Sequence, residues 1–204
     1  MNYLINNFFI PILFSSFIIG DCYQQFQEEI NNNLSEHYLH VSLSIEDSLV
    51  ISPNFILSDS INIIINKDAH EFVLDFNNSV LILNSHKSMN YFKKTNQLYI
   101  DYPDSLLIDK LFGFIDSDSI KDNCNTCFFQ LSENKYAFKS EQYNYTLFID
   151  LNKECNAIDK IEFLHEKFIF SSNQINLQFK ENYQNIDYLK ILGFPTDYFE
   201  FDLR

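Results

Sequence analysis

The feature that most constrains the fold is a repeated alternation of apolar and polar residues with a period of two. In HYLHVSLSI, residues 37–45, the apolar side chains Leu39, Val41 and Leu43 alternate with polar ones. Such alternation is typical of an antiparallel strand with one buried face. The pattern returns in SINIIINK, EFVLDF, NSVLILN, NQLYIDY, KYAFKS, NYTLFIDL, IEFLHEKFIF, QINLQFKE and DYFEFDL. The sequence therefore predicts a mainly β domain of about nine or ten short strands.

Helical spacing interrupts this pattern. The segment CYQQFQEEINNNLSE places Phe26, Ile30 and Leu34 four residues apart, which predicts an amphipathic helix before the first strand. The run Leu106–Phe114 predicts a short helix that is hydrophobic on more than one face, and NIDYLKILGFP is a weaker candidate for a second short helix. No Pro/Gly/Ser-rich linker divides the chain. We therefore expect one domain, a curved antiparallel sheet forming a half-open barrel capped by an N-terminal helix and short apolar helices.

Composition limits the possible partners and the turn chemistry. The net charge is -14, from 14 basic and 28 acidic residues. Because nucleic-acid binding needs clustered cations, this balance excludes a nucleic-acid binder, and it also disfavours peripheral binding to an anionic membrane. With only three glycines, the turns must use Asn, Asp and Ser, as in Asn77-Asn78 and in Lys93–Asn96.

The N-terminal segment predicts export. Residues 1–20 carry no charged side chain, and the apolar run Phe8–Ile19 has 12 residues. A span needs about 20 apolar residues, whereas 12 suit the apolar region of a signal peptide. We expect a signal peptide at residues 1–20 and a single mature domain at 21–204, with an uncleaved anchor as the main alternative. Lipid attachment at Cys22 is disfavoured, since the preceding Asp21 is neither small nor neutral.

The cysteines predict a disulfide. Oxidation is the default fate of thiols in an exported chain, and four cysteines allow three complete pairings that the sequence cannot separate. We favour a bridge between Cys155 and either Cys124 or Cys127, followed by a local Cys124–Cys127 bridge. Zinc binding or redox catalysis is less favoured, because a fourth ligand and a βαβ setting are both missing.

No constellation of residues indicates an enzyme. The chain has no Gly-rich phosphate loop, no nucleophile elbow and no His-Glu-x-x-His motif, and its five histidines are scattered. We therefore expect a protein that is not an enzyme and that uses no metal and no cofactor.

The stretch EFVLDFNNSVLILNSHKSMNYFKKTNQLYIDY, starting at Glu71, resembles the periplasmic outer-membrane lipoprotein carrier family, of the LolA type. Ser85–Asn90 stands at the family's turn and tryptophan positions, Phe92 at its tyrosine, and Asn96–Leu98 at its n-Q-v pattern. The run Leu106–Phe114 matches the short helix that follows, and FPTDYFEFDLR is similar to the family's tail. The resemblance covers most of the chain.

The resemblance implies a half-open barrel lidded by helices. Its apolar concavity would shelter the acyl chains of lipoproteins crossing the periplasm of a diderm bacterium. The implied partners are these acyl chains, an inner-membrane release complex and an outer-membrane receptor, and we expect a monomer. The alternative is an outer-membrane receptor or envelope scaffold of the same fold, lipidated at Cys22.

Three positions depart from the family pattern. His86 replaces the turn glycine and Asn90 replaces the tryptophan. In the family an arginine connects the sheet to the lid, and its nearest match here is Lys67. Lys67 is therefore a candidate for latching the lid, although it lacks the planar guanidinium group of an arginine.

The expected lining of the cavity and lid consists of apolar side chains interpreted as inward-facing: Leu39, Val41, Leu43, Ile63, Ile65, Phe72, Leu74, Val80, Ile82, Leu106, Leu107, Leu111, Phe112, Leu147 and Ile149. The competing interpretation is a fully packed core with no cavity.

Overall fold

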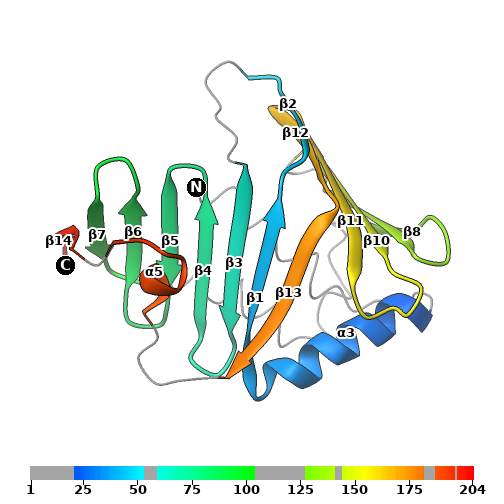
Figure 1. Ribbon diagram of the computed structural model, residues 1–204, viewed down its shortest axis with the longest axis horizontal. Helices are drawn as coiled ribbons and strands as arrows, with labels where there is room; N and C mark the ends of the chain where they lie inside the picture. Colours follow the sequence, from blue (N-terminus) through cyan, green and yellow to red (C-terminus); the bar gives the residue numbers. More distant parts are fainter. Residues whose placement is uncertain (1–20, 53–58, 104–126, 141–143, 182–186, 196) are drawn as a thin grey trace.

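The structure is a computed structural model that describes residues 21–52, 59–103, 127–140, 144–181, 187–195 and 197–204. Within these residues the protein is mainly β, with a helix at the start of the described chain, as the alternation and the helical spacing predict (Figure 1). No helix in the described part of the chain is long and apolar enough to cross a membrane.

The strands form two sheets. The larger sheet has eight strands, in the spatial order β13 (Gln174–Glu181), β1 (His37–Ser44), β3 (Ser60–Asn66), β4 (Glu71–Phe76), β5 (Ser79–Leu83), β6 (Ser88–Phe92), β7 (Gln97–Asp101) and β14 (Phe199–Asp202). Its neighbours are antiparallel except for β7 and β14, which pair in parallel. The smaller sheet has six strands, in the order β2 (Asp47–Val50), β12 (Phe168–Ser172), β11 (Ile158–His165), β10 (Tyr145–Leu151), β9 (Lys135–Ser140) and β8 (Cys127–Gln130).

The two sheets are connected at one corner, where two strands of one sheet continue into two strands of the other. β1 leads into β2 through residues 45–46, and β12 leads into β13 through residue 173. At the corner the Glu46 N–H donates to the Ser171 carbonyl over 3.1 Å, and the Asn173 amide donates to the Glu46 carboxylate over 2.8 Å. Because both strands leave the ladder here, the expected single sheet is divided in two. The two sheets do not close into a barrel.

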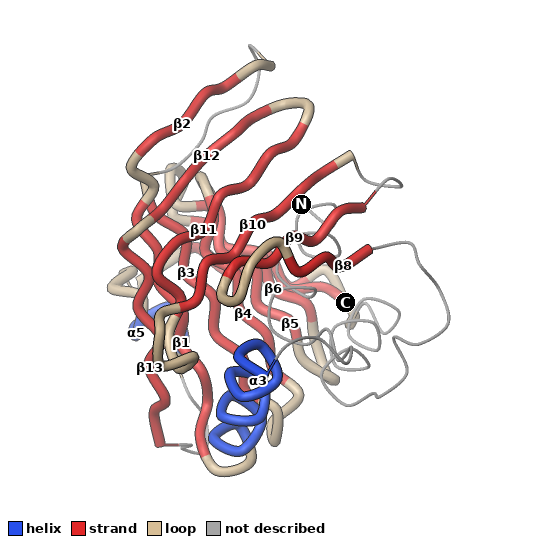
Figure 2. Tube along the Cα trace, turned by 90° about the vertical axis from the view of Figure 1, so that its right-hand side faces the viewer, coloured by secondary structure: helices blue, strands red, loops and turns tan. Residues whose placement is uncertain are grey.

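Helix α3 (Asp21–Leu34) packs against both sheets (Figures 1 and 2). Its predicted stripe of Phe26, Ile30 and Leu34 is buried, together with Tyr23. The Tyr23 ring lies 5.1 Å from that of Tyr136 in the smaller sheet. Burying each such side chain contributes about 1.5–3 kcal/mol, so this stripe rather than helix propensity holds the helix in place.

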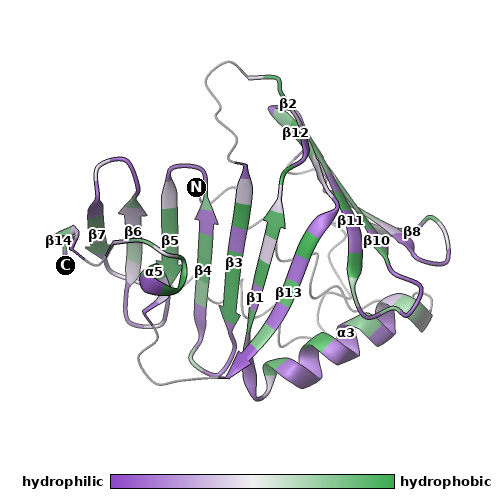
Figure 3. Ribbon diagram, in the orientation of Figure 1, coloured by the Kyte–Doolittle hydropathy of each residue, from purple (hydrophilic) through white to green (hydrophobic). Residues whose placement is uncertain are grey.

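The larger sheet is buried on both faces at its centre. We call the face that packs against α3 and the smaller sheet the inner face, and the opposite face the outer face. The outer face has its own core, which includes Ile64 and Val73, under the short helix α5 (Tyr188–Ile191). Accordingly, β3 to β5 are predominantly hydrophobic in Figure 3.

Helix α5 confirms the weaker helix prediction, which was made for NIDYLKILGFP near the end of the chain. It covers the outer face of the larger sheet, whereas α3 covers the inner face. Asp187 caps it by accepting a hydrogen bond from the Lys190 N–H. The Tyr188 hydroxyl donates to the Glu71 carboxylate, and burial together with this bond raises the pKa of Tyr188 above its ordinary value. The predicted helix Leu106–Phe114 lies outside the described residues.

Asparagine makes the tight turns that the scarcity of glycine requires. Asn77, Asn96 and Asn144 have φ angles of 55°, 51° and 51°. Such left-handed backbone conformations are unusual for residues other than glycine, and asparagine tolerates them better than most residues. The predicted turns at Asn77-Asn78 and Lys93–Asn96 are therefore confirmed.

Candidate functional site

Nine of the predicted lining residues come together between α3 and the two sheets. Each is at most 5% exposed, and all belong to one apolar cluster: Leu39, Val41, Leu43, Ile63, Ile65, Phe72, Leu74, Leu147 and Ile149. This part of the inner face is a packed core.

Val80 and Ile82 lie on the outer face, in the core under α5. The two-residue turn Asn77-Asn78 sets the register of β4 and β5, which pairs Leu74 with Leu81. The apolar inner-face residues of β5 are therefore Leu81 and Leu83, which belong to the core under α3. The sequence pattern could not reveal this parity, because both faces of β5 are buried.

The remaining predicted positions do not join the cluster. Lys67, the candidate latch, is half-buried in the turn between β3 and β4, where its carbonyl accepts the His70 N–H over 3.1 Å. The other four lie outside the described residues: Leu106, Leu107, Leu111 and Phe112.

Beyond β5 the inner face opens into a groove of about 640 Å³. Binding sites for small ligands typically measure about 300–1,000 Å³. We call this the β5–β7 groove, and it is lined by Leu81, Ser88, Asn90, Phe92, Thr95, Gln97, Tyr99, Asp101 and Leu203.

A single row of cross-strand neighbours connects the packed core to this groove. Pair by pair across the eight strands, the row contains Leu177, Val41, Ile63, Leu74, Leu81, Asn90, Tyr99 and Phe201. Every member except Asn90 is aliphatic or aromatic. The apolar surface under α3 therefore continues, strand by strand, to the edge of the sheet.

The aromatic side chains of the groove lining continue onto the neighbouring edge strand. The Tyr99 ring stacks on Phe201 with 5.0 Å between centroids and meets Phe92 edge-on at 5.5 Å. On the edge strand β14, Phe199 is 69% exposed and Phe201 is 40% exposed, and Leu203 beyond it is 59% exposed. A contiguous apolar surface of this kind commonly marks a binding site.

The lining of the groove mixes apolar and polar side chains, and the polar ones include no cation. Asp101 is the one charged side chain among the described lining residues. The Tyr99 hydroxyl donates to Oε1 of the Gln97 side chain over 3.4 Å. Asn90 Oδ1 is shielded from water and accepts no hydrogen bond from the described part of the chain. This arrangement suits an elongated apolar ligand whose polar end is neutral or positive.

No described cluster of three or more His, Cys, Asp or Glu side chains could hold a metal ion. The lining of the groove was missed from the sequence. The signal that could have identified it is the alternation itself, followed from the Asn77-Asn78 turn through SMNYF and NQLYID.

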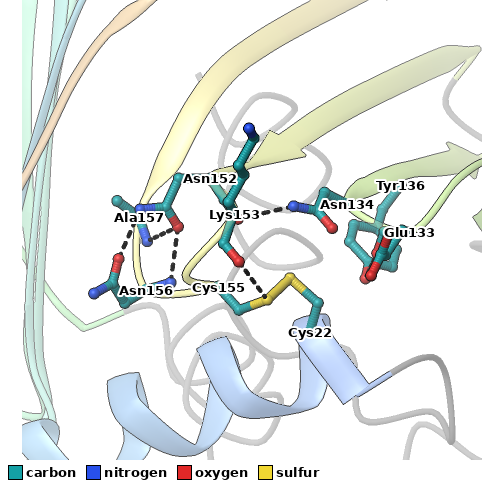
Figure 4. The surroundings of a disulfide bond; sticks show 9 residues. All are labelled: Cys22, Glu133, Asn134, Tyr136, Asn152, Lys153, Cys155, Asn156 and Ala157. Atoms are coloured by element: carbon teal, nitrogen blue, oxygen red, sulfur yellow. Dashed lines mark hydrogen bonds between the residues drawn. A yellow bond between two sulfur atoms is a disulfide. The ribbon is translucent and has the colours of Figure 1, made fainter.

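A disulfide lies at the N-terminal end of α3. Cys22, in the first turn of the helix, is bonded to Cys155, in the loop between β10 and β11 (Figure 4). In that loop the Asn152 side chain accepts the N–H groups of Asn156 and Ala157 over 3.0 and 3.2 Å. These bonds fix the conformation of the loop that carries Cys155.

The bridge confirms that Cys155 is in a disulfide, but the predicted partner was wrong. Cys22 takes the place expected for Cys124 or Cys127, because docking of α3 joins two residues 133 positions apart. Cys124 lies outside the described residues, and Cys127 begins β8. A local Cys124–Cys127 bridge is compatible with this pairing and stays a prediction.

No family model matches the sequence, and no curated protein is similar to it in sequence. Among solved structures, the chain is similar to an uncharacterized conserved protein from Thermus thermophilus. The identity is 15%, and the likeness covers 88% of this chain and 98% of that one, with a TM-score of 0.42. A likeness this distant does not bear on function.

Proposed function

We propose that this protein is an exported carrier that holds the acyl chains of lipoproteins on its inner face and moves them from the inner to the outer membrane of a diderm bacterium. The observation that carries the proposal is the apolar row that runs from under α3 across the open β5–β7 groove. Each methylene removed from water contributes about 0.8 kcal/mol, so such a surface can hold an acyl chain with few polar contacts.

The architecture supports the same proposal. Two sheets joined at one corner, with α3 between them, suit the half-open barrel that the resemblance to lipoprotein carriers implies. In this proposal Leu106–Phe114 acts as the lid over the acyl chains, and Lys67 takes part in latching it. A lid releases its cargo readily when its closed state is only marginally favoured.

The Cys22–Cys155 disulfide supports export and favours the soluble carrier over the anchored receptor. Disulfides persist in oxidising compartments such as the bacterial periplasm. A lipid anchor would have to be attached through the same Cys22 sulfur that the bridge occupies. The proposed partners are therefore a release complex at the inner membrane and a separate receptor at the outer membrane.

Native mass spectrometry of the exported protein, purified without detergent, tests the proposal. We expect a fraction of the molecules to carry an acylated ligand, and a mature N-terminus whose Cys22 bears no diacylglyceryl group. A protein that stays free of ligand after incubation with acylated lipopeptides would overturn the carrier function. A diacylglyceryl-modified Cys22 would instead support the anchored receptor.

A further inference from the structure

We infer that the β5–β7 groove selects acyl chains that are joined to a neutral hydrogen-bond donor, such as an amide N–H, and that Asn90 is the residue that recognises this donor. The inference rests on the proposed function, since it specifies the chemistry of the ligand in the same groove. It goes further because it separates amide-linked chains from esters and from free fatty acids.

The first observation is the position of Asn90. It pairs with Leu81 on one side and with Tyr99 on the other, in the middle of the apolar row. An acyl chain lying along this row would pass directly over Asn90. The amide is the one polar side chain in that row, so it is placed to determine where the polar end of the chain stops.

The second observation is the state of the Asn90 carbonyl. Its Oδ1 is shielded from water and accepts no hydrogen bond from any described residue. A buried acceptor without a donor costs free energy, and native structures rarely keep one without a reason. Asn90 itself lines the groove, between Leu81 and Tyr99, so a ligand seated there lies next to its side chain. A ligand N–H would supply the missing donor.

The third observation is the charge around the groove. The described lining contains the carboxylate of Asp101 and no Lys, Arg or His. A free fatty acid would bring a second carboxylate that finds no cation there and offers no donor to Asn90. An ester of the same chain would bring acceptors only. An amide brings the N–H without a negative charge.

Isothermal titration calorimetry with three matched ligands tests the inference: N-methyldecanamide, methyl decanoate and decanoate. The first two differ only in an N–H replaced by an oxygen. We expect the purified exported protein to bind the amide about tenfold more tightly than the ester, the ratio that one hydrogen bond of ordinary strength supplies. Decanoate should bind more weakly than the amide as well.

Two substitutions assign the preference to one side chain. In Asn90→Leu we expect the ratio of amide to ester affinity to fall to about one, with the ester bound at least as tightly as in the natural protein. Gln178→Leu is the matched control, because it removes an exposed amide from the outer face of the same sheet and should keep the preference. The thermal unfolding midpoint of Asn90→Leu should not fall, since no described protein donor to Oδ1 is lost.

The outcomes separate the two proposals. If the ester or decanoate binds as tightly as the amide, or if Asn90→Leu keeps the preference, the inference is wrong while the carrier function stands. A large drop in the unfolding midpoint of Asn90→Leu would show a structural role and would also overturn it. If none of the three ligands binds, both the inference and the proposed function are wrong.

Discussion

Removing the Cys22–Cys155 bridge should destabilise the protein strongly, because the bridge closes a very long loop. The two cysteines are 133 residues apart. In the chain-entropy treatment of disulfides, a loop of that length stabilises the folded state by about 5 kcal/mol at 25 °C through the unfolded state alone. The change is Cys22→Ala together with Cys155→Ala, and we expect a loss of about 3–5 kcal/mol in the free energy of unfolding.

The assay is urea unfolding followed by circular dichroism, in a background where Cys124 and Cys127 are alanine. In this background the free energy of unfolding of the oxidised protein should exceed that of the dithiothreitol-reduced protein by the same amount. The free energy of unfolding of the variant without Cys22 and Cys155 should not change when the reductant is added. Equal stability of the oxidised and reduced forms would refute the reasoning. So would peptide mapping of the natural protein that finds Cys155 joined to Cys124 or Cys127.

Three further predictions follow from the structure. Phe201→Ala removes the ring that stacks on Tyr99. In calorimetry it should weaken N-methyldecanamide binding about three- to tenfold, and in urea unfolding it should change the free energy of unfolding by about 1 kcal/mol or less. Burial, and next the charge of Lys180, lower the pKa of His40 in the folded protein. Because His40 therefore binds a proton more readily in the unfolded chain, the free energy of unfolding should decline as the pH falls below about 6.5. This decline should be less steep in His40→Gln. Asp187→Ala removes the α5 cap and should cost about 1 kcal/mol in urea unfolding, whereas an unchanged value would mean that the cap does not stabilise the helix.

Much of the fold could be predicted because single residues report it directly. The alternation around Leu39 and Val41 requires a half-buried strand, and the spacing of Phe26, Ile30 and Leu34 requires a helix with one apolar stripe. Both elements form as predicted. These patterns are local, so they need no knowledge of what packs against them.

The remaining features depend on contacts between distant residues. The β5 sequence SVLIL is buried on both faces, so only its pairing with β4 shows that Leu81 faces inward while Val80 and Ile82 face outward. The Cys22 pairing likewise depends on where α3 docks. The groove was missed because Asn90 looks like an ordinary polar strand residue until its cross-strand neighbours are known.

Photo-cross-linking tests the central claim, that acyl chains bind in the β5–β7 groove, most directly. A photoreactive phenylalanine analogue placed at Phe201 lies in the apolar row, and the same analogue at Phe129 serves as a control. Phe129 is similarly exposed, at 48%, but it pairs with Ala137 on the side of the smaller sheet that faces away from α3. With an acylated lipopeptide we predict a cross-link to the acyl chain from position 201 and none from position 129. Equal labelling at both positions, or labelling at position 129 alone, would contradict the account.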